Sequence, residues 1–157
     1  MSGRDWRAFG RLHAALYKAL GGRFVDRVGL GRKVLLLTTT GRRSGQPRTT
    51  PLVYMPRGKD LVVYPSNGGK ESEPAWWLNL QTTPAATIQI GRETLPIRAR
   101  QATGPEYAAI WPEAAQYNPH WRSYAQTVQR PIPLVILQGV DVQGGVGGGE
   151  AGLDSGG

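Results

Sequence analysis

The chain has 157 residues, of which 39% are hydrophobic and 19% charged, as expected for one globular domain with its own hydrophobic core. Nineteen Lys and Arg against eleven Asp and Glu give a formal net charge of +8 at pH 7. This charge favours anionic partners without choosing among phosphate esters, polycarboxylates, nucleic acid and an acidic membrane surface. The absence of cysteine excludes disulfides, thiolate zinc sites and cysteine nucleophiles.

The spacing of the histidines and the length of the apolar runs argue against a metal site, a secretory signal and a membrane span. His13 and His120 are far apart in the sequence and lack the spacing of a histidine metal motif, so we expect no metal site. The first thirty residues carry scattered Arg and Lys and no long apolar run, so we expect no secretory signal. The longest apolar runs, 34–37 and 133–137, are too short to span a bilayer. We therefore expect a cytoplasmic protein.

Residues 1–32 are predicted to form an N-terminal amphipathic helix and a linker. Apolar side chains recur there at helical spacing, with basic residues beside the other face, and Gly21-Gly22 ends the helix. Two interpretations stay open. The helix packs on the domain as a lid, or it contacts the inner face of the membrane, since a basic helix with Trp and Phe suits that interface. The apolar residues are Trp6, Phe9, Leu12, Leu16, Tyr17 and Leu20.

Three strands are expected next, because their segments are rich in β-branched and apolar residues and are separated by turn sequences. They are Lys33–Thr40, Thr50–Met55 and Asp60–Tyr64. The long connection 41–49 joins the first two, and a hairpin turn at 56–59 joins the second and third.

A helix is expected from about Pro74, a residue suited to the first helical position, and it stops before Pro84. The rest of the domain is predicted as a hairpin, two helices and a last strand: Ala86–Ile90, Thr94–Arg100, Glu106–Ala115, His120–Val128 and Ile132–Gln138. Residues 33–138 thus form the domain. Residues 139–157 are rich in glycine and cannot bury apolar area, so we expect a flexible tail.

The order of these elements predicts an α+β fold. Most strands are joined as hairpins, which favours a mostly antiparallel sheet closed into a small barrel with flanking helices. A doubly wound parallel sheet would need a helix after nearly every strand. No GxGxxG or Walker A sequence follows a strand, so dinucleotide-binding and P-loop functions are not supported.

Two loops carry candidate binding residues. The segment 38–48 places Arg42, Arg43 and Arg48 around two glycines, and arginine forks suit phosphate and carboxylate oxygens. The segment 65–70 offers a hydroxyl, an amide and the pair Gly68-Gly69, which can form an anion-accepting nest. Each loop alone also fits a solvated turn. Because both lead toward the helix that bears Trp76-Trp77, we expect a groove for a long anionic ligand with a flat ring at one end.

Two aromatic groups complete the candidates. Adjacent indoles on a helix point about 100° apart, so one of Trp76 and Trp77 faces a pocket while the other packs in the core. Tyr117, Trp121 and Tyr124 recur at spacings of four and three, so one helical face can carry all three. The residues alone leave open whether that face lines a substrate pocket or packs in the core.

These segments together resemble the deazaflavin-dependent nitroreductase and quinone reductase family. The resemblance rests on 36–48 followed by Pro51-Leu52, on 66–69 leading into 74–80 and Pro84, and on 131–135. It runs from about Val34 to Leu137 in the same order and spacing. It implies an FMN-binding-like split β-barrel that binds coenzyme F420, whose deazaflavin ring delivers a hydride and whose chain ends in a phosphate, a lactyl group and several γ-linked glutamates.

The resemblance also implies residue roles. Arg42, Arg43, Ser44 and Arg48 would hold the phosphate and the glutamate tail. The ring and the cofactor wall would be lined by Thr49, Thr50, Pro51, Leu52, Val53, Tyr64, Pro65, Ser66, Asn67, Ala75, Trp76, Trp77, Leu78 and Asn79. Ser66 and Tyr124 would be catalytic donors to the acceptor.

The acceptor side departs from the family's pattern. Tyr117, Trp121 and Tyr124 would line the substrate site, but Asn118 and Trp121 stand where members that activate nitroaromatics carry tyrosines. Asn67 stands where relatives often have lysine, and Lys70 is the nearest basic residue that can compensate.

We therefore expect an oxidoreductase that transfers a hydride from reduced F420 to a small electron-poor acceptor such as a quinone or a nitro compound. An FMN-dependent split-barrel reductase is the alternative enzyme, since it shares the fold. A basic nucleic-acid-binding barrel is the non-enzyme alternative. No RNP-type aromatic pattern appears, so we expect no nucleic acid partner. The oligomeric state is not predicted.

Overall fold

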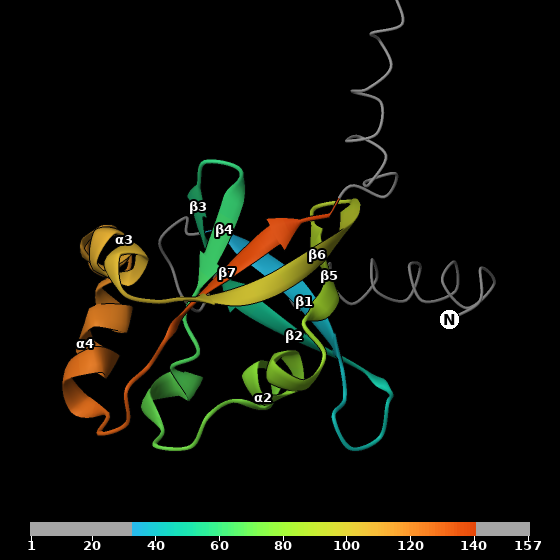
Figure 1. Cartoon of the computed structure of the whole chain (residues 1–157), viewed down its shortest axis with the longest axis horizontal. Helices are drawn as coiled ribbons and strands as arrows, with labels where there is room; N and C mark the ends of the chain where they lie inside the picture. The colour runs from blue at the N-terminus through green and yellow to red at the C-terminus, as the bar shows by residue number, and fades with distance from the viewer. Residues whose placement is uncertain (1–32, 141–157) are drawn as a thin grey trace, which may run out of the picture.

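The computed structural model describes residues 33–140, shown in Figure 1. The helix expected in 1–32, with its lid or membrane role, lies outside these residues, as does the tail from 141 to 157. The described elements, in chain order, are β1 Val34–Thr40, β2 Pro47–Val53, β3 Met55–Arg57, β4 Asp60–Val63, the short 3₁₀ turn η1 Asn67–Gly69, α2 Ala75–Thr82, β5 Ala85–Ile90, β6 Glu93–Ala102, α3 Pro105–Tyr117, α4 Pro119–Thr127 and β7 Leu134–Gly139.

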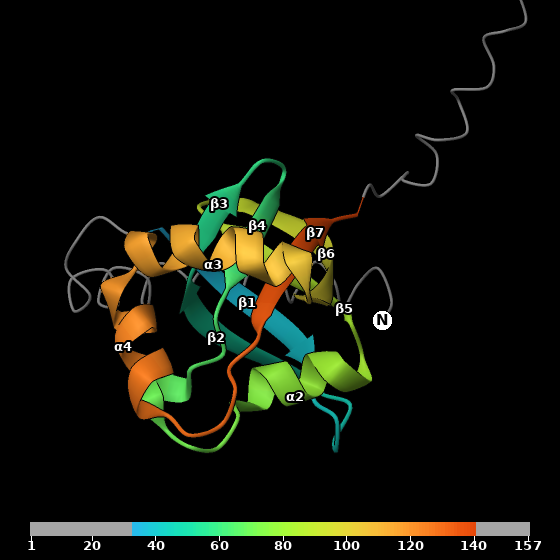
Figure 2. The ribbon, with the colours of Figure 1, turned by 60° about the vertical axis from the view of Figure 1, so that its left-hand side comes forward.

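The seven strands form one antiparallel sheet in the order β2-β1-β5-β6-β7-β4-β3. Strands β2 and β3 lie at opposite edges of this order, yet only Tyr54 separates them in the chain. A flat sheet of this width would place its edges roughly 29 Å apart, far beyond the reach of one residue. The sheet must therefore curl until its two edges meet, which gives the split-barrel shape in Figures 1 and 2.

Both faces of the central strands are buried, which explains their nearly continuous apolar runs. Along β7, Val135 and Leu137 pack in one core cluster with Leu35 and Leu37, while Leu134 and Ile136 pack in another. Helix α2 contributes Trp76, Trp77 and Leu80 to the first cluster, and α3 and α4 contribute Ile110, Ala114 and Trp121 to the second. The sheet is thus covered from two sides, and the helices lie where its strands end.

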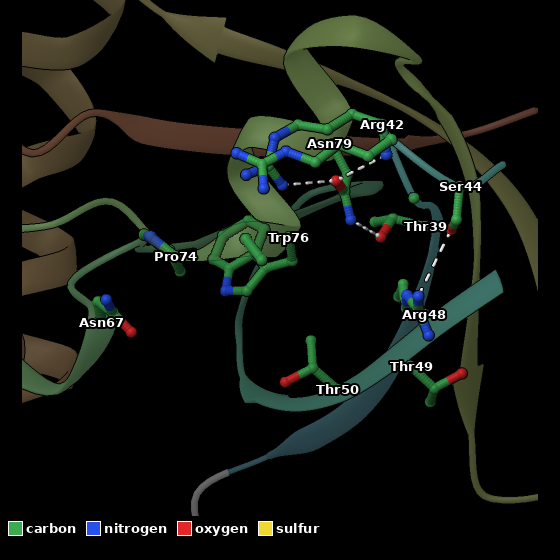
Figure 3. Close-up of a pocket in the computed structure, with 13 residues that line it drawn as sticks. Thr39, Arg42, Ser44, Arg48, Thr49, Thr50, Asn67, Pro74, Trp76 and Asn79 are labelled. Atoms are coloured by element: carbon green, nitrogen blue, oxygen red, sulfur yellow. Dashed lines mark hydrogen bonds between the residues drawn. The ribbon is translucent and has the colours of Figure 1, made fainter. Parts of the chain in front are cut away.

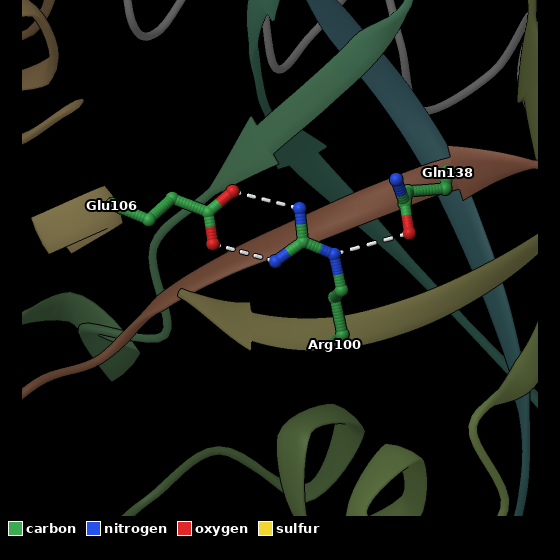
Figure 4. A network of polar contacts seen from close by, with 3 residues as sticks. All are labelled: Arg100, Glu106 and Gln138. Carbon is green, nitrogen blue, oxygen red and sulfur yellow. Dashed lines mark hydrogen bonds and ion pairs between the residues drawn. The ribbon is translucent and has the colours of Figure 1, made fainter. Parts of the chain in front are cut away.

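Helix α3 is tied to the sheet by a polar network around Arg100 of β6 (Figure 4). The guanidinium donates to both carboxylate oxygens of Glu106 at 2.6 and 2.7 Å and to Oε1 of Gln138 in β7 at 3.1 Å. The hydrogen bond from Arg100 lowers the pKa of Glu106 below its usual value. This network holds the first turn of α3 against strands β6 and β7. Helix α4 follows α3 and contacts the η1 turn (Figure 2).

The predicted α+β class, the antiparallel sheet and the flanking helices α2, α3 and α4 are confirmed. The predicted strand Thr50–Met55 is wrong at both ends. Strand β2 already begins at Pro47, because Pro47 and Arg48 pair with Thr40 and Thr39 of β1. The chain then leaves that pairing at Tyr54, where it passes to the other edge of the sheet as β3. Propensity could not reveal this change of partner.

The segment 117–124 is not one helix. Tyr117 ends α3, Asn118 has an extended backbone, and α4 begins at Pro119 with the Asn118 side chain accepting a hydrogen bond from the N–H of His120 at 3.0 Å. The expected single face carrying Tyr117, Trp121 and Tyr124 is therefore wrong, because the helix is interrupted after Tyr117. Among the described helices, none is long and apolar enough to cross a membrane. Residues 33–140 hold no group of three His, Asp or Glu side chains arranged for a metal ion.

Candidate functional site

The buried side chain of Asn79 joins helix α2 to the loop between β1 and β2. Its Oδ1 accepts hydrogen bonds from the main-chain N–H and from Nη1 of Arg42, both at 3.1 Å, and its Nδ2 donates to Oγ1 of Thr39 at 3.0 Å (Figure 3). Asn79 is only 2% exposed. Because this amide uses both its donor and its acceptor in the protein, it positions Arg42 and has little left for a ligand.

The loop that carries the arginines has a tight internal structure. Gly41 donates to the carbonyl of Gln46 at 2.8 Å, and a Cβ at Gly41 would lie 2.8 Å from Oγ of Ser44 and 3.1 Å from that carbonyl. A larger residue there would have to displace the Ser44 hydroxyl. Oγ of Ser44 accepts from the N–H of Gln46 at 3.1 Å. It also accepts from Nη2 of Arg48 at 3.4 Å (Figure 3). The hydroxyl of Ser44 thus shapes the loop and orients Arg48.

A groove of about 480 Å³, which we call the anion groove, lies between this loop and the start of α2. Arg42, Arg43 and Arg48 line it, and no Asp or Glu does. None of the three forms an ion pair within residues 33–140, so their charges are available to a ligand. The groove is lined by Thr39, Gly41, Arg42, Arg43, Ser44, Arg48, Thr49, Thr50, Asn67, Pro74, Ala75, Trp76 and Asn79.

A second cavity of about 490 Å³, which we call the aromatic pocket, adjoins the anion groove. The two share Thr50, Asn67, Pro74 and Trp76, so one elongated ligand can reach from the arginines to the aromatic side chains. The aromatic pocket is lined by Thr50, Pro51, Leu52, Val53, Tyr64, Ser66, Asn67, Gly68, Pro74, Trp76, Asn118, His120, Trp121 and Tyr124. The expected groove for an anion with a flat ring at one end matches this arrangement.

The loop 65–70 lines the aromatic pocket through Ser66, Asn67 and Gly68, and Asn67 also lines the anion groove. Ser66 is buried, and its main-chain N–H donates to the carbonyl of Tyr64 at 2.8 Å. The N–H groups of Gly69 and Lys70 donate to the carbonyls of Ser66 and Asn67 at 2.9 and 3.2 Å. The N–H of Gly69, one of the pair expected to form an anion-accepting nest, is therefore used within the loop and is not available to an anion. The Asn67 amide donates to Ser72, and Lys70 lines neither cavity.

Tyr64 forms the inner wall of the aromatic pocket. Its ring centroid lies 5.3 Å from that of Trp111 and 5.6 Å from that of Trp121. Burial raises the pKa of the Tyr64 phenol well above its ordinary value of 10, Tyr107 adds to this rise, and Arg130 opposes it. The phenol is therefore neutral throughout the physiological pH range.

The structure brings together most of the residues that the sequence singled out. The predicted catalytic pair Ser66 and Tyr124 line the aromatic pocket together. Four of the predicted residues line neither cavity. The hydroxyl of Tyr117 donates to the carbonyl of Tyr54 at 2.8 Å, and Trp77 lines a separate cavity of about 450 Å³. Pro65 and Leu78 complete this set. Trp76 faces the site while Trp77 faces away from it, as expected for adjacent indoles.

Sequence reasoning assigned no role at the site to Thr39, Asn118 or His120. His120 lines the aromatic pocket one helical turn before Tyr124, and this spacing was the available signal. Asn118 was considered only as a replacement for a tyrosine, yet its side chain caps the N-terminus of α4 by accepting a hydrogen bond from the N–H of His120. Thr39 pairs with Asn79 across forty residues, which no local pattern shows.

Comparisons with known proteins point to one group of reductases. The family model of the F420H(2)-dependent quinone reductases matches residues 9–139. An F420H(2)-dependent quinone reductase of Mycobacterium tuberculosis is 35% identical over 130 residues, which cover 81% of this chain and 87% of the relative. The solved structure of an F420-H2 dependent reductase is 31% identical with a TM-score of 0.62, covering 68% of this chain and 95% of that one. A solved chain described as a domain-swapped dimer is 27% identical with a TM-score of 0.63, covering 87% and 100%.

Replacing Asn79 should loosen the arginine loop. We expect Asn79→Ala to lower the free energy of unfolding by about 1–3 kcal/mol, because the buried hydroxyl of Thr39 and the N–H of Arg42 lose their partner. Asn79→Asp is the matched control, since a carboxylate accepts both bonds from Arg42 and can accept from the Thr39 hydroxyl. Urea unfolding of both variants measures the effect, and equal losses would contradict the role given to the amide oxygen.

The raised pKa of Tyr64 predicts a loss of stability at alkaline pH. Above pH 10 the phenol ionises in the unfolded chain but stays protonated in the folded one, so the unfolded state binds fewer protons and is favoured as the pH rises. This group contributes a slope of less than about 1.4 kcal/mol per pH unit. The free energy of unfolding of Tyr64→Phe should fall less steeply between about pH 10 and 12. Parallel pH profiles would contradict the prediction.

Proposed function

The chain belongs to the F420H(2)-dependent quinone reductase family, and from this premise we propose that it reduces quinones with F420H2 bound across the anion groove and the aromatic pocket. It is accordingly an F420H2-dependent oxidoreductase, and F420 rather than FMN is its cofactor. The observation that carries the proposal is a groove lined by three arginines that form no ion pair within residues 33–140 and by no acidic side chain. This groove is continuous with a cavity walled by aromatic rings. A polyanionic chain attached to a planar ring fits both halves.

The residues divide into two groups along the site. Arg42, Arg43 and Arg48 would hold the phosphate and the glutamates of the coenzyme through charge-assisted hydrogen bonds. Trp76 and Thr50, which line both cavities, would lie along the deazaflavin between the anionic end and the reacting end. Asn79 contributes indirectly, because its amide fixes Arg42 at the groove.

When bound, the reduced deazaflavin supplies the hydride. Reduction of a quinone to a hydroquinone also adds negative charge to oxygen and requires a proton there. Ser66 and Tyr124 line the aromatic pocket with hydroxyl groups that can donate to that oxygen as its charge develops. The same two donors suit the oxygens of a nitro group, so nitro compounds form the second acceptor class in our proposal. Trp121 supplies an apolar wall for either acceptor.

Removing one arginine should weaken coenzyme binding. We expect Arg43→Ala and Arg48→Ala each to raise the dissociation constant for F420 roughly tenfold to a hundredfold, the scale of a charge-assisted hydrogen bond. Arg92→Ala is the control, because Arg92 is exposed in the turn between β5 and β6 and lines neither cavity. Fluorescence titration at physiological salt measures the constants. Binding equal to the unmodified protein in both groove variants would refute the proposed role of the loop.

Removing the Tyr124 hydroxyl should slow turnover and leave coenzyme binding nearly unchanged. We expect Tyr124→Phe to lower kcat for a quinone about tenfold to a thousandfold, the range for loss of one proton or oxyanion donor. Tyr107→Phe removes a phenol hydroxyl outside both cavities and is the control. Turnover, coenzyme affinity and melting temperature are measured on the same preparations. A lower melting temperature with unchanged turnover would make Tyr124 a packing residue.

A further inference from the structure

Arg130, which follows α4, donates hydrogen bonds to the loop that carries Ser66. Its Nη2 lies 3.2 Å from each of three carbonyl oxygens, those of Pro65, Ser66 and Lys70. These carbonyls belong to one turn of the chain and converge on one nitrogen. A side chain about sixty residues away in sequence thus sets the direction of the backbone on both sides of Asn67.

A second set of hydrogen bonds joins the same two segments. The carboxylate of Glu71, at the end of the same loop, accepts hydrogen bonds from the N–H of Gln129 at 3.0 and 2.9 Å and from that of Arg130 at 3.3 Å. Residues 129–130 donate all of these hydrogen bonds and the segment 65–71 accepts them, so the two segments are joined as a clasp. Because Arg130 follows α4 directly, the clasp also fixes the loop relative to the helix that bears Tyr124.

The loop in turn supports the Tyr124 ring. A Cβ at Gly69 would lie 3.0 Å and 3.2 Å from two ring carbons of Tyr124, so the ring rests directly on the backbone at this residue. Gly69 also has a φ of +88°, which disfavours any other residue. The position of the ring therefore depends on the path of the loop that Arg130 holds.

Stability alone does not account for Arg130. Its Nε and Nη1 are buried and have no hydrogen-bond partner within residues 33–140. Burying a half-paired guanidinium is unfavourable, and an apolar side chain of similar size at such a position often leaves stability unchanged or raises it. Arg130 therefore adds little to the free energy of unfolding, and its three carbonyl contacts point to a role in placing the loop 65–70.

We propose that Arg130 is a positioning residue, whose guanidinium holds the loop 65–70 so that Ser66 and Tyr124 face the same acceptor. It touches neither coenzyme nor acceptor. This inference rests on the proposed function, in which the aromatic pocket receives the acceptor. Its structural half, the dependence of the loop on Arg130, can be measured without either ligand.

The test compares Arg130→Met with Arg130→Lys. Methionine keeps the length and loses every donor, whereas an ammonium brings three N–H donors to the three carbonyls. In the ligand-free protein, we expect amide hydrogen exchange of the peptide 65–72 to rise at least about tenfold in Arg130→Met, with exchange in β1 and β7 unchanged. The melting temperature should stay close to that of the unmodified protein. Arg130→Lys should recover most of the protection.

With F420H2 and a quinone, we expect Arg130→Met to lower kcat/KM at least about tenfold, while the affinity for F420 changes much less. Arg122→Met is the matched control, since Arg122 is exposed on α4 and lines neither cavity. In Arg130→Ala, added guanidinium ion should restore part of the activity by occupying the carbonyl cluster.

Unchanged exchange in the loop of Arg130→Met would overturn the inference, and so would a folding failure, because Arg130 would then be a stabilising residue. Equal losses in Arg130→Met and Arg130→Lys would also overturn it, since the carbonyl contacts would not be what matters. If the unmodified protein reduced no quinone while the exchange result held, the proposed acceptor would be wrong and the positioning of the loop would stand.

Discussion

The buried amide of Asn79 is the constraint on which the site depends. The tryptophans of helix α2 pack against the sheet, and the β1–β2 loop follows the last residue of β1. Neither element alone fixes the distance between the helix and the loop. One carboxamide with its donor on Thr39 and its acceptor on Arg42 does so, at a position almost closed to solvent. An apolar residue there would leave a buried hydroxyl and an N–H unpaired.

Among residues 33–140, the arginines of the anion groove differ from those held by carboxylates or main-chain carbonyls, and the difference indicates where charge serves binding. Arg57 and Arg100 are paired with Glu113 and Glu106 on the surface, and Arg130 is enclosed by main-chain carbonyls. The arginines of the anion groove are exposed, lie on the β1–β2 loop and at the start of β2, and have no acidic neighbour in the lining. Like charges held together without counter-charge repel one another, so an anion that enters the groove relieves this repulsion.

Much of the fold followed from the sequence because it depends on local pattern. The strand 34–40 combines four apolar residues with three threonines, the helix from Ala75 stands between prolines, and the hairpin of β5 and β6 turns at glycine. The crossing at Tyr54 did not follow, because one residue carries the chain between sheet edges without any local signal. The site residues on the two loops were found through chemistry and resemblance. Those that act through contacts forty to sixty residues apart, such as Thr39 with Asn79 and Arg130 with the loop 65–70, could not be predicted.

The central claim is that the anion groove binds the charged end of a deazaflavin, and a titration with two ligands tests it most directly. Dissociation constants are measured at low and at physiological salt for F420 and for the same deazaflavin ring lacking the phosphate and the glutamates. The account predicts that F420 binds at least about tenfold more tightly and that its advantage shrinks as salt rises, because exposed arginines are screened. Equal affinity for the two ligands at both salt concentrations would contradict it.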